Sequence, residues 1–270
     1  MRVDWDNPIS DDPLNVGLVS RWQVGEDNPL WGGPKLYDLC GINHGLLTGF
    51  AASDNPWKPA GPVGSIGSLS FSSASSQYIP TANIPNLTTW TLLAWLYDAG
   101  VGTRSVIGQI DSSAQNATFF WRYGASSGFT VGAASYLQVT LTVPPANIWT
   151  RCAFVYDGAS LLGYQNGVLF DPVAASGTPA NPGTTIATIG RLGDFAGQYW
   201  EGGMDDVRVY SRALSATELV AEYQDSKAGS PDTLNWYKPK RYFFVDAGGG
   251  GTFNASWARY SNILIQPGAA

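Results

Sequence analysis

The chain has 270 residues, enough for one large β domain or two small ones. Charged residues make up only 13% of it, whereas glycine (32), tryptophan (11) and tyrosine (13) are abundant, which is typical of a loop-rich, aromatic β protein. The net charge of −6 argues against a nucleic-acid-binding protein, because phosphate recognition needs clustered Lys and Arg side chains. No window approaches the roughly 20 apolar residues of a membrane span, and the N-terminus lacks the apolar core of a signal peptide. We therefore expect neither nucleic acid nor a membrane as a partner.

The first part of the chain predicts an arm followed by short strands. Residues 1–16 hold four aspartates and two prolines without periodicity, so we interpret them as an N-terminal arm before a core domain that begins at Gly17. Residues 90–97 are apolar on both faces, as in a central strand covered on each side or in a strand that lines an aromatic groove. Other early strands are expected at 18–22, at 69–71 and at 77–79, the last two joined by a serine-rich turn.

The middle of the chain continues this pattern of strands and turns. Strands are predicted at 119–123, 129–133, 137–143, 151–156, 161–165 and 168–170. Asn166-Gly167 tolerates positive φ and predicts a two-residue hairpin turn of type I′ between the last two. About a dozen short strands at regular spacing indicate an all-β, antiparallel sandwich or jelly roll rather than a βαβ fold.

The segment 189–223 predicts a last strand and one short helix. Val207 and Val209 alternate with polar residues, as in a half-buried strand. Ser215 and Glu218 form a capping box, the signature of a helix start. Residues 225–270 then read as a linker and a C-terminal extension, too apolar for a solvated tail, which we expect to dock on the core or on a neighbouring subunit.

Several spaced motifs resemble one superfamily in sequence order. They lie at 38–45, 67–79, 90–95, 149–158, 164–168, 189–191 and 203–219. Together they are similar to the concanavalin A-like, laminin-G-like lectin and glucanase superfamily over residues 17–224. The resemblance implies a two-sheet antiparallel jelly roll with one short C-terminal helix. It implies no one function, because this fold occurs in lectins, carbohydrate-binding modules, adhesion domains, glycosidases and virion proteins.

The flanks are similar to a narrower group. Residues 15–22, 236–245 and 258–265 resemble the flanks of laminin-G-like proteins found among bacteriophage structural genes and in environmental bacteria. This likeness implies a structural role in an assembly.

Catalytic motifs of the fold are not recognisable in the sequence. A retaining glucanase would present Glu-x-Asp-x-Glu on one strand, but none of the four glutamates begins such a run. We assign Glu218 to the capping box and Glu222 to the helix surface. The Gly-x-Ser-x-Gly match at 124–128 lies between two predicted strands, whereas a nucleophile elbow joins a strand to a helix. The sequence thus predicts that the protein is not an enzyme.

The candidate metal ligand is Asp205. It shares strand parity with Val207 and Val209, which predicts that it faces inward, whereas Asp206 is assigned to the surface. A buried carboxylate is hydrogen-bonded, paired or metal-bound, so the alternatives are an anchor for loops and a calcium ligand. We expect no cofactor, with calcium as the alternative. Cys40 and Cys152 lack metal spacing and are predicted to be buried thiols rather than a disulfide.

Candidate sugar-binding residues are aromatic. Exposed rings form the platforms on which sugars stack, and Trp121, Tyr123 and Tyr136 are the candidates. The alternative for each is a place in the core, where most aromatic side chains of β sandwiches are buried.

Two functions follow as hypotheses. The first is a virion protein, a decoration or fastening protein of a phage capsid or fibre, whose termini contact other subunits of an oligomeric assembly. The alternative is a carbohydrate-binding lectin or adhesion module, located outside the cell or at its surface, with glycans as partners.

Overall fold

The computed structural model describes residues 13–24, 35–41, 43–51, 53–54, 56–58, 61–62, 65, 67–131 and 135–228. The predicted docking of the arm (1–16) and of the C-terminal extension (225–270) lies outside these residues, apart from 13–16 and 225–228. Among the described residues, no helix is both long and apolar enough to cross a membrane.

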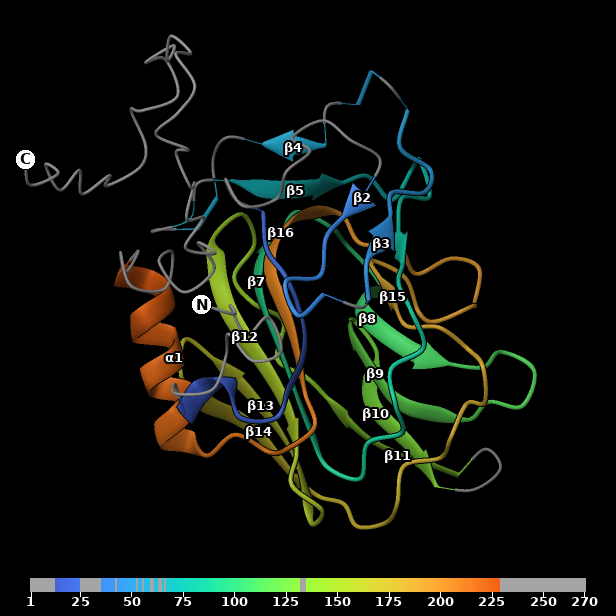
Figure 1. The fold of residues 1–270 in the computed structure, drawn as a ribbon, viewed down its shortest axis with the longest axis vertical. Coiled ribbons are helices and arrows are strands. Elements are labelled where there is room, and N and C mark those ends of the chain that lie inside the picture. The colour runs from blue at the N-terminus through green and yellow to red at the C-terminus, as the bar shows by residue number, and fades with distance from the viewer. Residues whose placement is uncertain are drawn as a thin grey trace, which may run out of the picture. The chain divides into compact units, whose positions relative to one another are not determined.

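Two antiparallel sheets form the fold, as predicted (Figure 1). The eight-stranded sheet has the order β14 (Val168–Ala174), β13 (Ser160–Gln165), β12 (Trp149–Tyr156), β7 (Trp90–Asp98), β16 (Gly202–Tyr210), β5 (Ser68–Phe71) and β4 (Trp57–Lys58), with β1 (Leu18–Trp22) paired to β16. The six-stranded sheet has the order β11 (Ser135–Thr140), β10 (Ser126–Val131), β9 (Ala117–Tyr123), β8 (Arg104–Ile110), β15 (Thr188–Ile189) and β6 (Ile79–Pro80). A small third sheet pairs β2 (Lys35–Leu36) with β3 (Gly45–Leu46), and a short 3-10 helix spans Pro13–Asn15.

The main core lies between the two large sheets and is rich in aromatic rings. Trp90 of β7 contacts Phe119 of β9 and Phe154 of β12, with ring centroids 6.1 and 5.0 Å apart. Because strand residues alternate between faces, Phe119, Trp121 and Tyr123 all point into this core. Phe120 and Arg122 therefore lie on the opposite face of the six-stranded sheet, which we call its outer face.

Several strand predictions are confirmed, and one long strand was missed. The predicted central strand is β7, buried along almost its whole length between β12 and β16. Asn166 and Gly167 have φ of 51° and 78°, which confirms the turn between β13 and β14. Residues 69–71 lie in β5 and Ile79 lies in β6, and a serine-rich turn at 73–76 joins them as predicted, although the two strands belong to different sheets. Strand β8 was not predicted.

The helix α1 (Ala216–Ala228) lies against the face of the eight-stranded sheet that is turned away from the six-stranded sheet (Figure 1). Its capping box is present: the Ser215 N–H donates to Glu218 Oε2 over 2.8 Å, and the Glu218 N–H donates to Ser215 Oγ over 3.3 Å. Leu219 packs with Leu93 and Tyr210 of the sheet below. The helix extends to Ala228, so residues 225–228 are helical rather than part of a linker.

Candidate functional site

Two of the three candidate sugar-binding residues are wrong. Trp121 is fully buried and Tyr123 is 3% exposed, and both belong to the core between the sheets. They alternate with Phe120 and Arg122, and the sequence could not show which of the two faces was covered. Because a sugar ring cannot reach a buried side chain, these two residues are structural.

Tyr136 of β11 is the candidate that lies at the surface. Its side chain is 36% exposed, and its ring meets the edge of Phe120 with centroids 5.8 Å apart. Its hydroxyl donates a hydrogen bond to Gln115 Oε1 over 2.8 Å. The ring is therefore held by two contacts while part of it remains open to solvent on the outer face of the six-stranded sheet.

Arg122 lies next to this ring pair. Its guanidinium is 5.3 Å from the centroid of Phe120, and its Nη1 donates to Gln198 Oε1 over 3.3 Å. Its Nε donates to the carbonyl of Ser126. Burial lowers the pKa of Arg122, because removing water disfavours the charged guanidinium.

Tyr78, Arg191 and Tyr199 form a second group of side chains, and Tyr199 directly follows Gln198, the partner of Arg122. The guanidinium of Arg191 lies 3.8 Å from the centroid of Tyr78, whose ring is 6.2 Å from that of Tyr199. Tyr78 and Tyr199 are half-buried, and each is followed by a core residue that points the other way. We call Tyr78, Phe120, Arg122, Tyr136, Arg191 and Tyr199 the aromatic–arginine face. The sequence analysis identified only Tyr136 among these six residues. Phe120 and Arg122 alternate with the buried residues of strand 119–123, and that alternation could have placed them on the opposite face.

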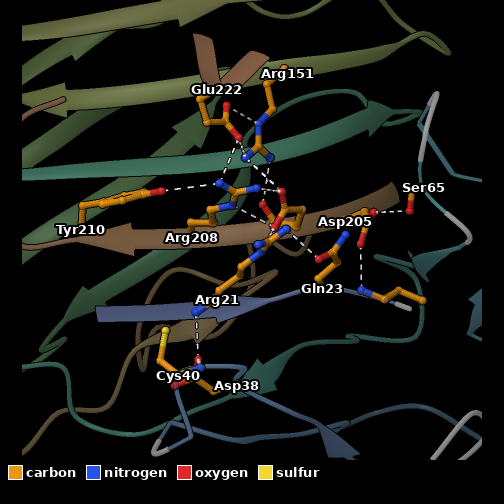
Figure 2. Close-up of polar contacts among 12 residues, drawn as sticks. Arg21, Gln23, Asp38, Cys40, Ser65, Arg151, Asp205, Arg208, Tyr210 and Glu222 are labelled. Carbon is orange, nitrogen blue, oxygen red and sulfur yellow. Dashed lines mark hydrogen bonds and ion pairs between the residues drawn. The ribbon is translucent and has the colours of Figure 1, made fainter. Parts of the chain in front are cut away.

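A second polar cluster lies buried under α1. Asp206 accepts hydrogen bonds from Arg21 Nε (2.7 Å), Arg208 Nη2 (2.5 Å) and Arg151 Nη2 (3.2 Å). Glu222 of α1 accepts from Arg151 Nε at 3.0 Å and faces Arg208 Nη1 at 3.3 Å (Figure 2). Asp206 and Glu222 are 3% and 1% exposed, so both surface assignments are wrong. The arginines of the sheet hold these carboxylates and join α1 to β12 and β16.

Asp205 points to the helix side of the sheet rather than into the main core, so its predicted direction is wrong. Met204 and Val207 both face the core, which requires an extra residue between them. A β-bulge supplies it: the pairing of β16 with β7 shifts between Asp205 and Arg208, and Asp206 has φ of 48°. A bulge reverses the parity of every later residue, and the alternation alone did not reveal it.

Asp205 anchors two segments of the chain. It accepts hydrogen bonds from the N–H of Val24 (2.8 Å) and from the hydroxyl of Ser65 (2.6 Å). Burial, followed by the neighbouring Asp206 carboxylate, raises the pKa of Asp205 to about 7. Calcium requires six to eight oxygen ligands, and the groups found here donate hydrogen bonds to Asp205. No cluster of three or more His, Cys, Asp or Glu side chains suits a metal within the described ranges. The described surroundings of Asp205 therefore do not fit calcium, and the expectation of no cofactor, with calcium as the alternative, stays a prediction.

The two cysteines are free thiols, as predicted. Cys152 is buried and Cys40 is half-buried. Burial raises the pKa of both thiols to about 12.

A sequence model described as the concanavalin A-like lectin/glucanases superfamily matches residues 71–220. The chain belongs to this superfamily. The predicted resemblance is thereby confirmed, and the narrower likeness to bacteriophage proteins remains a prediction. Among curated proteins, none matches the chain.

Solved structures share the fold of this superfamily member. One is domain 4 of AbnA, an extracellular GH43 arabinanase from Geobacillus stearothermophilus, in complex with arabinotriose (15% identity, TM-score 0.51, 76% of this chain and 97% of that one). Another is the binding domain of botulinum neurotoxin DC in complex with SialylT (12%, 0.58, 79% and 52%). A third is Trypanosoma rangeli sialidase in complex with sialic acid (14%, 0.53, 80% and 34%). The chain thus spans about half of the neurotoxin chain and a third of the sialidase chain.

These structures correct the expectation that the protein is not an enzyme. An arabinanase and sialidases contain the same fold, so the sequence-based exclusion of enzymes is contradicted. At 12–15% identity the likeness shows the fold alone and assigns no reaction to this chain.

Proposed function

We propose that this protein is a carbohydrate-binding, lectin-like domain and that its glycan lies on the aromatic–arginine face. The observation that supports it most is the pairing of a partly exposed ring, Tyr136, with hydrogen-bonding side chains beside it. Sugar rings are apolar on their faces and polar around their edges, so they suit a surface of ring faces flanked by donors and acceptors. Tyr136 supplies the exposed ring, which the buried Phe120 supports, and Gln115, Gln198 and Arg122 supply the polar groups.

A second tyrosine pair adds two half-buried rings to this surface. Tyr199 follows Gln198 in the chain, and Gln198 contacts Arg122 through its side chain and accepts a hydrogen bond at its carbonyl from the N–H of Ser105 in β8. Because the two rings are half-buried and contact each other, they lose little conformational freedom when a ligand binds. Three fold neighbours were solved with arabinotriose, SialylT and sialic acid, which supports the same class of ligand here.

A glycan array followed by titration calorimetry tests this proposal. Tyr136→Ala is expected to weaken binding roughly tenfold or more, because truncating an aromatic anchor of a binding site typically costs about 2 kcal/mol. Phe170→Ala is the matched control, since Phe170 is an aromatic side chain 50% exposed on the other sheet. Equal affinities for the wild type and both variants, or no glycan bound at all, would overturn the proposal.

The same proposal includes a location outside the cell or at its surface. Glycans are displayed there, and the arabinanase neighbour is extracellular. The virion role, with subunit contacts through 1–16 and 225–270, depends mainly on residues outside the described ranges. It remains a prediction that electron microscopy of the native assembly can test.

A further inference from the structure

The described arginines divide into two groups by their partners. Five form ion pairs with carboxylates: Arg21, Arg104, Arg151, Arg208 and Arg212. Arg122 and Arg191 form none with any carboxylate in the described part of the chain. These two are also the arginines of the aromatic–arginine face.

Both unpaired arginines are positioned by neutral groups. Arg122 donates through Nε and Nη1 to a carbonyl and an amide oxygen, and Arg191 donates through Nε to the carbonyl of Gly193 over 3.0 Å. Each guanidinium also lies near an aromatic ring, Phe120 or Tyr78. These contacts fix the planes of the guanidinium groups, and the remaining N–H groups have no partner among the described residues.

A guanidinium held in this way is complementary to an anion. Its parallel N–H groups match the two oxygens of a carboxylate or sulfate, and such charge-assisted hydrogen bonds are about twice as strong as neutral ones. Arg122 is also partly desolvated, so a bound anion would offset the cost of keeping its charge away from water. A neutral ligand would leave both charges uncompensated.

We infer that the ligand of the aromatic–arginine face is an anionic glycan whose carboxylate or sulfate groups are bound by Arg122 and Arg191. This inference rests on the proposed carbohydrate-binding function and narrows its ligand class. The protein has a net charge of −6, which repels anions at long range. Salt screens that repulsion beyond roughly 8 Å at physiological ionic strength, so the direct arginine contacts decide the preference.

The test is an array that pairs each acidic glycan with a neutral counterpart. Uronate oligosaccharides are matched with their carboxyl-reduced forms, and sulfated oligosaccharides with their desulfated forms. The wild type is expected to bind the acidic member of at least one pair roughly tenfold more tightly than the neutral member. A hydrogen bond to a charged group typically changes an affinity by about that factor. A preference among the uronate pairs would identify carboxylate as the bound group, and a preference among the sulfated pairs would identify sulfate.

Arg122→Gln and Arg191→Gln are then measured by calorimetry on the preferred pair. Each is expected to weaken binding of the acidic glycan roughly tenfold and binding of its neutral counterpart by a smaller factor, so that the preference for the acidic glycan decreases. Arg191→Lys keeps the charge without the paired N–H groups, and we expect an intermediate loss. Thermal melting shows that each variant is folded before it is compared.

Two outcomes overturn the inference in distinguishable ways. If neutral glycans bind as tightly as acidic ones and the arginine variants change nothing, the anion preference is wrong while carbohydrate binding stands. If no glycan of either kind binds, the proposed function is wrong as well.

Discussion

Asp205 and Asp206 are consecutive in β16, yet their carboxyl groups have opposite pKa shifts. Burial and the adjacent Asp206 raise the pKa of Asp205 to about 7. Burial would also raise the pKa of Asp206, but the guanidinium groups of Arg208, Arg21 and Arg151 outweigh it and hold that pKa well below its usual range. The bulge between β16 and β7 causes this difference, because it directs Asp205 to the N–H of Val24 and Asp206 to the three arginines.

Asp206→Asn is expected to lower the free energy of unfolding by about 3–5 kcal/mol, because it leaves buried arginines without their shared carboxylate. Urea denaturation measures the change. Glu218→Gln is the control: Glu218 pairs with Arg212 at the partly exposed helix start, where the loss should stay below about 1 kcal/mol. Similar losses for the two variants would mean that the buried cluster does not hold α1 on the sheet.

Asp205 predicts a pH dependence of stability. Its folded pKa of about 7 lies above the usual carboxyl value of 3.8, so the carboxyl group ionises at lower pH in the unfolded chain than in the folded protein. The contribution of Asp205 to stability is therefore full below pH 3.8 and is lost as the pH rises toward 7. Asp205→Asn removes this titration. Between pH 4 and pH 8, the free energy of unfolding of the variant should rise relative to that of the wild type. A constant difference over this pH range would contradict the raised pKa of Asp205.

Trp121 and Tyr136 are expected to respond differently to truncation. Trp121→Ala should destabilise the protein by about 3–5 kcal/mol, because it leaves a large cavity between the sheets. Tyr136→Ala removes a partly exposed ring and should cost no more than about 1.5 kcal/mol while it weakens glycan binding. Chemical denaturation of both variants checks this separation, and comparable losses of stability would show that Tyr136 belongs to the core.

Both thiols are expected to be unreactive in the folded protein. Burial raises the pKa of Cys40 and of Cys152 to about 12, so almost no thiolate is present at pH 8. A colorimetric disulfide reagent should modify them only after denaturant is added. Fast modification of either cysteine in the native protein would show that its sulfur is accessible to solvent, and it would contradict this prediction.

The sequence predicts the sandwich and its family but not what covers each face. The strand at 119–123 is predicted, but whether a sugar can reach Trp121 and Tyr123 depends on the second sheet, which covers their face of the strand. The sequence assigns Asp206 and Glu222 to the surface because their partner Arg151 is distant in sequence and only the fold brings the three side chains together. Strand β8 lacks an alternating pattern because it is buried on both faces.

Hydrogen–deuterium exchange of the protein with and without its preferred glycan tests the proposed binding face most directly. We expect slower exchange in peptides that cover 119–123, 135–140 and 190–200, with no change in 168–174 or 216–228. Protection confined to β14 and α1, or to residues 90–98 and 149–156 of the other sheet, would contradict it.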